Sequence, residues 1–470
     1  MHNAPEIWRH VDANSPDLIA LSDRVWGMPE TCYRETRSSA EHRAELVRQG
    51  FRVTENVAGI PTAVIGEAGE GGPTVAFLGE YDALPDLSQE AGVAERRPVE
   101  AGGNGHGCGH NLLGAGALLA AVAVRDWLKA TGRPGRVRYY GCPAEEGGAA
   151  KTFMVRAGAF ADVDIAISWH PHSVCDVMAA GSLANARIDF TFRGRAAHAA
   201  SSPHLGRSAL DAVELMNVGV NYMREHMPTD ARVHYALIDA GGIAPNVVQA
   251  NATVRYLIRS PDLPGLAPLV GRVRKVAQGA ALMTETTVEA CTLSAVSNLV
   301  PNAPLEAAMR RHLETLGPPP FDEADRAFAR AIQATYGAEE VASALAPFEA
   351  EGIVEGPLSE TLVPAAARRA GMAASTDVGD VSWVVPTVQM WGANYAVGTP
   401  FHTWQMVAQG KSPAAHKGMV HAAKVMAAVA QQAFSEPHLV AAARQDFERR
   451  TARTPYACPL PPETRPPLTM

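Results

Sequence analysis

The sequence predicts an α/β protein with a mainly parallel sheet, into which a smaller α+β domain is inserted. Two observations lead to this fold class. Short apolar strands alternate with helical segments before residue 185 and again after about residue 300. Between these parts, the order of strands and helices is typical of a separate small sandwich. At 470 residues, of which 47% are hydrophobic, the chain is long enough for two or three domains with large cores.

Regular alternation marks the first part of the chain. Residues 6–49 are expected to be helical, because Leu18, Leu21 and Val25 have the spacing of one apolar face. The sequence then predicts strands at 75–78, 137–142 and 164–168, and helices at 111–129 and 149–157. Such alternation indicates a parallel sheet covered by helices.

The segment from 185 to 299 follows a different pattern. Residues 187–193 alternate polar and apolar side chains, as expected of a half-buried strand. Then follow a helix at 209–225, strands at 232–237 and 252–259, a helix at 265–281 and a strand at 286–292. The order β-α-β-β-α-β predicts a ferredoxin-like sandwich with helices on an antiparallel sheet. We therefore assign residues 185–299 to an inserted domain, and residues 1–184 and 300–470 to the domain that encloses it.

The last part of the chain gives a weaker pattern. A helix at about 416–434 is expected to close the enclosing domain. The tail from residue 452 is rich in proline and threonine and is expected to pack as an irregular strap. Prolines punctuate the segment 315–360, which is left without an assignment.

Composition limits the classes of function. The formal net charge of -8 argues against non-specific binding of nucleic acids, which needs a basic face. The apolar stretch 112–124 is shorter than the ~18–20 residues of a membrane span, so a buried helix is expected there. Six cysteines without framework spacing, and a polar N-terminus without a signal peptide, predict a reduced, cytoplasmic protein.

Residues with functional side chains follow successive strands of the predicted sheet. They lie in the segments 79–82, 105–111, 143–148 and 169–172. In an open parallel sheet, the carboxyl ends of the strands meet at one edge. The side chains expected to converge there are Glu80, Asp82, Cys108, His110, Glu145, Glu146 and His170.

This set of side chains suits a metal centre. Thiolate, imidazole and carboxylate groups are the ligands of zinc and related divalent ions. Cys108 and His110 are two residues apart, so both side chains face one way in an extended loop. Glu145 and Glu146 are adjacent and point in opposite directions in an extended segment. One of them can then bind metal while the other reaches a bound water.

Each motif alone has a simpler interpretation. The Cys108-Gly109-His110 segment could form a tight turn with a buried thiol, the glutamate pair could be solvated, and His170 could be a core histidine. The glycine-rich run 102–109 lacks the G-x-G-x-x-G order, which argues against a dinucleotide-binding loop. The conjunction of these motifs at successive strand ends favours the metal site.

Six ordered motifs resemble those of the M20 metallopeptidase and amidohydrolase family over nearly the whole chain. The motifs are GCGHN at 107–111, PAEEG at 143–147, GRAAHAA at 194–200, PNVV at 245–248 with Arg259, STDVGDVSW at 375–383 and GTPFHT at 398–403. They are most similar to the branch of aminobenzoyl-glutamate hydrolase subunits. The resemblance implies a zinc-peptidase-like catalytic domain and an inserted domain that serves as a lid and in dimerisation.

The resemblance also implies roles for the matching residues. The metal ligands would be Cys108, His110, Glu146, His170 and His402, which would hold two divalent ions per subunit, zinc or manganese. Glu145 would be the general base that activates the metal-bound water, and then the acid that protonates the leaving amine. Where dinuclear peptidases of the family have His-x-Asp, this chain has Glu80-Tyr81-Asp82, so Glu80 is a doubtful ligand.

Further residues would act around the metal ligands. In a homodimer, His198 would reach the active site of the partner protomer and stabilise the tetrahedral oxyanion. Asn246 and Arg259 would hold the substrate, Arg259 through a bidentate grip on a carboxylate. Asp82 and Asp380 would orient metal ligands by forming hydrogen bonds with them, without binding the metal themselves. A surface role for His198, and a surface ion pair for Arg259, are the alternatives.

These assignments predict a metal-dependent amidohydrolase that acts on a small molecule. The implied substrate is an N-acyl amino acid or aryl amide similar to p-aminobenzoyl-glutamate. A dipeptidase and a hydrolytic deaminase of an aromatic amine are alternatives that need the same activated water. A non-catalytic partner protein would be expected to have lost a ligand or the base. The resemblance to a branch of named subunits also raises the need for a second, different chain.

Overall fold

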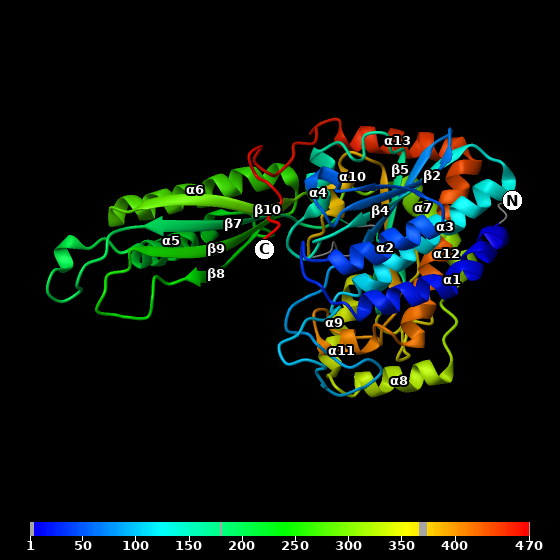
Figure 1. Ribbon diagram of the computed structural model, residues 1–470, viewed down its shortest axis with the longest axis horizontal. Coiled ribbons are helices and arrows are strands. Elements are labelled where there is room, and N and C mark those ends of the chain that lie inside the picture. Colours follow the sequence, from blue (N-terminus) through cyan, green and yellow to red (C-terminus); the bar gives the residue numbers. More distant parts are fainter. Residues whose placement is uncertain (1–3, 179–180, 366–373, 470) are drawn as a thin grey trace.

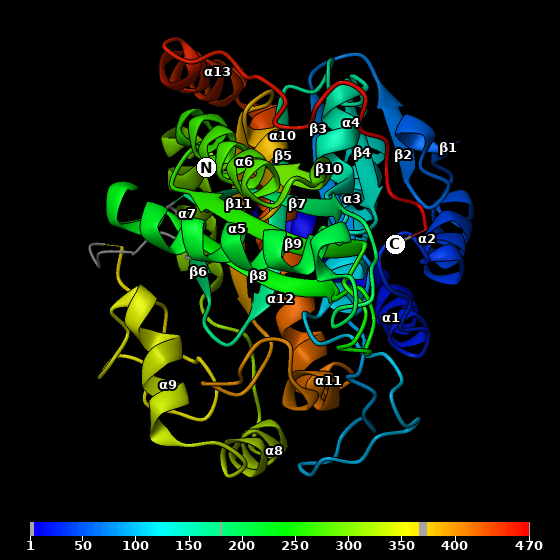
Figure 2. The same ribbon diagram turned by 90° about the vertical axis from the view of Figure 1, so that its left-hand side faces the viewer.

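The chain forms a large α/β body from which a narrow arm extends (Figure 1). The computed structural model describes residues 4–178, 181–365 and 374–469. The arm comprises residues 184–296, and the segments on both sides of it belong to the body. Viewed from the end of the arm, its sheet and two long helices lie in front of the body (Figure 2).

The body is built on a seven-stranded sheet with the order β1-β2-β4-β3-β5-β11-β6. Its strands are β1 (Arg52–Glu55), β2 (Val64–Glu70), β3 (Thr74–Glu80), β4 (Gly135–Cys142), β5 (Ile165–His172), β6 (Asp176–Val177) and β11 (Thr387–Ala393). The central strands β4, β3, β5 and β11 are parallel. At the edges, β1, β2 and β6 pair antiparallel. The predicted mainly parallel sheet is therefore confirmed, with antiparallel additions that the sequence pattern did not indicate.

Helices cover both faces of this sheet. The body contains α1 (Ala4–Trp26), α2 (Thr36–Arg48), α3 (His110–Thr131), α4 (Ala150–Arg156), α7 (Ala303–Leu316), α8 (Glu323–Gln333), α9 (Ala338–Leu345), α10 (Val378–Ser382), α11 (Trp404–Gln409), α12 (Pro413–Ser435) and α13 (Pro437–Thr451). Alternate side chains of β3 enter two different cores. Val75 and Phe77 pack with residues of α1, α3, α7 and α12. Ala76 and Leu78 belong to the core that contains residues of α4 and α10. The parallel strands are thus buried on both sides.

The arm is the inserted ferredoxin-like sandwich that the sequence predicted. Its elements are β7 (Ala184–Arg193), α5 (Ala209–Met223), β8 (Arg232–Asp239), β9 (Asn251–Ser260), α6 (Leu263–Thr284) and β10 (Thr287–Val296). The antiparallel sheet has the order β10-β7-β9-β8. Ile188, Phe190 and Phe192 alternate along β7 and form one core with apolar residues of α5 and α6. The other face of β7 is half-buried, and β8 forms an exposed edge.

The structure differs from the sequence prediction at several ends and connections. The segment 6–49 is two helices, because residues 27–35, which include Gly27 and Pro29, interrupt the helical spacing. The unassigned segment 315–360 contains α8 and α9, and α8 begins with a capping box between Asp322 and Asp325. Short 3-10 turns lie at Val57–Gly59, Pro203–Leu205, Arg224–His226 and Ala346–Phe348. Residues 452–469 form neither helix nor strand, as expected.

Helix α3 is the only described helix that is long and apolar enough to cross a membrane. It extends beyond the apolar stretch 112–124 and has 22 residues. Inside the protein, 89% of its most apolar window is buried, and it packs between the sheet and helices α1 and α12. The expectation of a buried core helix is therefore confirmed for this segment.

Candidate metal centre

The centre lies where the parallel strands end and α3 begins. Cys108 and His110 are held by a tight turn whose middle residue, Gly109, has a φ of 78°. A side chain at Gly109 would clash with the hydroxyl of Tyr395, so both the conformation and the space require glycine. Cys108 and His110 are almost fully buried. The turn thus aims both side chains at the ends of β3 and β5.

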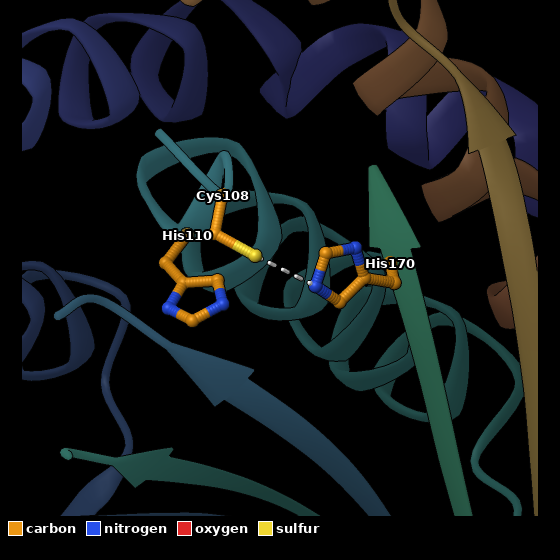
Figure 3. Close-up of side chains that lie close together, drawn as sticks. All are labelled: Cys108, His110 and His170. Carbon is orange, nitrogen blue, oxygen red and sulfur yellow. Dashed lines mark hydrogen bonds between the residues drawn. The ribbon is translucent and has the colours of Figure 1, made fainter. Parts of the chain in front are cut away.

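A first group of candidate ligands consists of Cys108, His110 and His170 (Figure 3). Their ligand atoms all lie within 4.8 Å of one another. The sulfur of Cys108 is 3.5 Å from Nε2 of His170, which is part of β5. Nδ1 of His170 lies 2.9 Å from the carbonyl oxygen of Pro171. Because that oxygen can only accept a hydrogen bond, Nδ1 carries the proton and Nε2 offers its lone pair to the site.

Asp82 orients His110 in the same way. Its carboxylate lies 2.9 Å from Nδ1 of His110, so Nδ1–H donates and Nε2 is left for the centre. The other oxygen of Asp82 accepts a hydrogen bond from the backbone N–H of Glu146 at 2.9 Å. Burial alone would raise the pKa of Asp82, but the contacts with His110 hold this pKa below its usual value. These contacts are those expected of a residue that supports a ligand.

A second group consists of Cys108, Glu146 and His402, again with all ligand atoms within 4.8 Å. Nε2 of His402 lies 3.4 Å from a carboxylate oxygen of Glu146. The backbone N–H of His402 donates a hydrogen bond to the carbonyl of Gly107 at 2.9 Å. His402 also has a φ of 59°, a conformation rare outside glycine. The hydrogen bond between His402 and Gly107 fixes the loop before α11 against the turn before α3. It thereby brings His402, which is distant in sequence, to the site.

Glu80, His110 and Glu145 form a third close group. Oε2 of Glu80 lies 3.3 Å from Nε2 of His110. Oε1 of Glu80 accepts a hydrogen bond at 2.6 Å from the buried ammonium of Lys151, which donates a second bond at 2.6 Å to Asp377. The sequence motifs left Glu80 a doubtful ligand and did not single out Lys151. Only the fold shows that Lys151, at the start of α4, lies between the carboxylates of Glu80 and Asp377 and offsets part of their negative charge.

Several buried polar atoms of these groups lack a hydrogen-bond partner among the described residues. They are Nε2 of His110, Oε2 of Glu80 and Oε1 of Glu146. Buried polar atoms are normally satisfied, so unsatisfied donor atoms within these groups favour a site that binds a cation. A thiol, imidazoles and carboxylates together are the donors that suit divalent transition metals. The residues present therefore fit a metal centre.

Glu145 has the environment of a proton carrier. Burial raises its pKa well above the usual value, and the nearby carboxylates of Glu80, Glu146 and Asp377 raise it further. A cation in the centre would lower the pKa again by Coulomb attraction. Glu145 also faces the large pocket described next, whereas Glu80 does not line it. The arrangement thus leaves a buried carboxyl group with a raised pKa at the edge of the candidate centre.

The candidate centre opens into a pocket of about 820 Å³. Part of its wall is aromatic, because the ring of His172 lies 4.9 Å from Trp391 and 5.3 Å from both Phe348 and Phe401, measured between ring centroids. Another part comes from the arm. The arm residues that line the pocket include Asn185, Arg187, Leu257, Arg259, Ser294 and Val296. The pocket is therefore lined by candidate metal ligands, by aromatic side chains and by guanidinium groups.

His198 and Asn246 do not line this pocket. Both are exposed residues of the arm. Their loops are joined, because the backbone N–H of Ala199 donates to the carbonyl of Asn246 at 3.0 Å. Nδ1 of His198 accepts hydrogen bonds from the backbone N–H groups of Ala200 and Ser201 at 3.2 and 3.1 Å. Nε2 of His198 must therefore carry the proton when the ring is neutral, and it is available as a donor.

Asp380 does not have the contacts that its motif predicted. Its carboxylate accepts hydrogen bonds from Thr152, from the backbone and hydroxyl of Ser297, and from Tyr456. None of these partners is one of the candidate ligands. Asp380 thus joins α4, α10, the end of the arm and the C-terminal tail. Contrary to the expectation from its motif, these hydrogen bonds do not orient a candidate metal ligand directly. The acid of the same motif that contacts the site's network is Asp377, through Lys151.

The combination of this fold and this site defines a class of hydrolases, and the comparison of sequences agrees. Residues 76–393 match the model of peptidase family M20/M25/M40. The chain therefore belongs to this family, whose members are metal-dependent hydrolases.

Two individual relatives are similar to the chain over nearly its whole length. The chain is 47% identical to the B subunit of the p-aminobenzoyl-glutamate hydrolase of Escherichia coli, over 98% of this chain and 99% of that protein. It is 28% identical to the Xaa-Arg dipeptidase of Mus musculus, over 93% of this chain and 90% of that protein.

Two solved structures have the same fold. An aminobenzoyl-glutamate utilisation protein from Klebsiella pneumoniae has a TM-score of 0.60 at 18% identity, and the match covers 90% of this chain and 97% of that chain. A dinuclear metal-binding M20 peptidase from Bacillus subtilis has a TM-score of 0.56 at 16% identity, with 90% and 99% covered. At these identities, the two structures support the fold of the body and of the arm.

Proposed function

We propose that this chain is an amidohydrolase that splits the amide between an aromatic acyl group and an amino acid, with p-aminobenzoyl-glutamate as the reference substrate. One observation carries the proposal. A single pocket contains the candidate metal centre, the aromatic wall around Trp391, and Arg259 of the arm. The E. coli relative named for hydrolysis of p-aminobenzoyl-glutamate supports the same substrate class.

The metal ligands in this proposal are the two groups that share Cys108. Cys108, His110 and His170 form one group, and Cys108, Glu146 and His402 form the other. Two overlapping groups suit a pair of divalent ions, zinc or manganese, as in the dinuclear B. subtilis relative. Bound there, the ions would polarise the amide carbonyl and lower the pKa of water toward neutrality.

Glu145 moves the proton in the proposed reaction. Its carboxylate accepts a proton from the attacking water, and the resulting acid gives this proton to the nitrogen of the leaving amino acid. The groups that raise its pKa favour the protonated form, which the second transfer requires. Lys151 holds Glu80 in place beside His110 and offsets part of the negative charge of Glu80 and Asp377.

The pocket accounts for both halves of the substrate. An aryl group fits the wall of Phe348, Trp391 and Phe401, where ring contacts add to the burial of apolar surface. Arg259 binds the carboxylate of the amino acid, since its buried Nε has no hydrogen-bond partner among the described residues. This wall favours an aryl amide over the dipeptides of the Mus musculus relative. The presence of every candidate ligand and of the base argues against a non-catalytic role.

We further propose a homodimer in which His198 and Asn246 complete the partner's site. Both residues are exposed at the arm and away from the pocket of their own chain. Large apolar side chains are exposed on the same arm, on α5 and along the edge strand β8 and the loop after it. They are Leu215, Val218, Tyr222, Tyr235, Leu237, Ile238 and Ile243. An exposed strand edge with apolar neighbours is a common pairing surface.

An assembly with a different chain is a second arrangement to test. The E. coli relatives are named as the A and B subunits of one hydrolase, which supports a mixed assembly.

We also assign the protein to the cytoplasm. All six cysteines lie in the described part of the chain and are free, as expected of a reducing compartment.

A substrate panel tests the proposed function. The purified protein, loaded with Zn²⁺ or Mn²⁺, is expected to hydrolyse p-aminobenzoyl-glutamate with a kcat/KM at least about 10-fold above that for an N-acetyl amino acid, because an acetyl group leaves the aromatic wall empty. Release of p-aminobenzoate is followed by absorbance. Preference for dipeptides without an aryl group would contradict the proposal, and ammonia release from an aromatic amine would favour the deaminase.

A further inference from the structure

Two arginines of the arm face the pocket without an acidic partner in the described part of the chain. Arg187 lies on β7 and Arg259 on β9, and both line the pocket. In the antiparallel register, Arg187 is opposite Leu257 and Arg259 is opposite Asn185. The two arginines are therefore diagonal neighbours on one face of the sheet, with a spacing of roughly 7–8 Å that long side chains can shorten.

The nearby acid of the same strand is already paired. Asp189 accepts two hydrogen bonds from Arg255, at 2.7 and 2.9 Å. Within the described residues, neither Arg187 nor Arg259 has an ion pair, and Nε of Arg259 is buried without any partner. Guanidinium groups stay charged in proteins, and a half-buried charge without a counter-ion is unfavourable. A bound anion would satisfy both of them.

Arg187 reaches the loop that carries the two site glutamates. Its Nη1 donates a hydrogen bond to the carbonyl of Gly147 at 3.3 Å. A β-carbon at Gly147 would lie 2.7 Å from this nitrogen, so the glycine leaves the room that the guanidinium occupies. Arg187 is thus held against the residue that directly follows Glu145 and Glu146, at the side of the pocket where the candidate centre lies.

We propose that Arg187 binds a second carboxylate of the substrate and makes the enzyme selective for amides of dicarboxylic amino acids. Arg259 holds the α-carboxylate and Arg187 the side-chain carboxylate of the leaving glutamate or aspartate. This inference rests on the proposed function, because it assigns the specificity of the same pocket. It predicts discrimination against amides of neutral amino acids by charge and not by size.

The test compares p-aminobenzoyl-glutamate with p-aminobenzoyl-glutamine, which has the same shape but lacks the second charge. The wild-type protein is expected to prefer the glutamate amide by about 10- to 100-fold in kcat/KM, the range of a charge-assisted bidentate contact. The Arg187→Met variant should lose this factor on the glutamate amide and stay within about threefold on the glutamine amide. Arg187→Lys, which keeps the charge but not the planar fork, should retain part of the preference.

The matched control is Arg193→Met. Arg193 is exposed, lies on the same strand β7 and does not line the pocket, so its loss should leave both substrates unchanged. Melting temperatures show whether each variant is folded. Equal rates for both amides in the wild-type protein, or an equal loss for both in Arg187→Met, would overturn the inference.

A binding measurement separates this inference from the proposed function. Calorimetry measures the affinity of the metal-loaded protein for each of the two amides in the Glu145→Gln background, in which hydrolysis should be slow. The same preference for glutamate, lost in Arg187→Met, supports the role of Arg187 even where the wild-type protein hydrolyses neither amide, an outcome that would refute the proposed function alone. Equal binding of both amides in this background with Arg187 intact would refute the role of Arg187 while hydrolysis by the wild-type protein stands.

Discussion

Replacing Glu145 by glutamine is expected to lower kcat for p-aminobenzoyl-glutamate by about 10²- to 10⁴-fold, the usual contribution of a general base. The amide has the shape of the acid but cannot accept a proton from water. Glu145 lines the pocket and lies with Glu80 and His110 in one close group, so it is placed to serve the reacting atoms. Steady-state kinetics measure the loss, and elemental analysis measures the metal content.

The metal content distinguishes a proton carrier from a ligand. Glu145→Gln should bind as much metal as the wild-type protein, whereas Glu146→Gln should bind less, since Glu146 contacts His402. Glu70→Gln makes the same change at an exposed residue, at the end of β2 that pairs with the start of β4, and should keep full activity. Near-normal activity of metal-loaded Glu145→Gln would show that another group moves the proton.

Mixing a His198→Ala protein with a Glu145→Gln protein is expected to restore activity that neither has alone. The His198→Ala protein should be about 10²- to 10³-fold slower than wild type, as for other oxyanion donors. Half of randomly assorted dimers are mixed, and each has one site with Glu145 and a partner's intact His198, so about a quarter of the wild-type activity should return. The physical reason is the exposed position of His198 outside the pocket of its own chain.

A second pair of variants provides the control for this experiment. Glu145→Gln and Cys108→Ala both alter the pocket of their own chain, so their mixed dimers contain no intact site and should stay inactive. A pull-down with two affinity tags reports the exchange of protomers. Exchange without recovery in the first mixture would show that His198 does not act in the partner's site.

The parts of the fold that could be predicted are the elements whose apolar periodicity is complete within one segment. The buried strand β3 and the long helix α3 each satisfy their apolar periodicity within one segment, and both were located to within a few residues. The edge strand β1 was missed, because its four residues are mostly exposed and carry no apolar pattern. Helix α9 was missed because its eight residues are mostly exposed and too few to show an apolar period, although alanine and glutamate favour helix.

The candidate site was predictable where side chains that can bind metal follow the carboxyl ends of predicted strands. Cys108, His110 and His170 follow from the rule that the carboxyl ends of parallel strands share one edge, and the structure brings them together. His402 was assigned only from the family motif, since its approach depends on a loop held by Gly107. Arg187 was not singled out, because a strand arginine has no distinguishing spacing. Its unpaired state becomes visible only when the whole sheet is assembled.

Hydrolysis of p-aminobenzoyl-glutamate before and after removal of metal tests whether the protein is a metal-dependent amidohydrolase. The protein is stripped with a chelator, its metal content is measured, and Zn²⁺ or Mn²⁺ is added back in steps. Stripping is expected to abolish hydrolysis, and activity should return with bound metal and reach its maximum near two ions per chain. Full hydrolysis by protein shown to be free of metal would contradict this metal dependence.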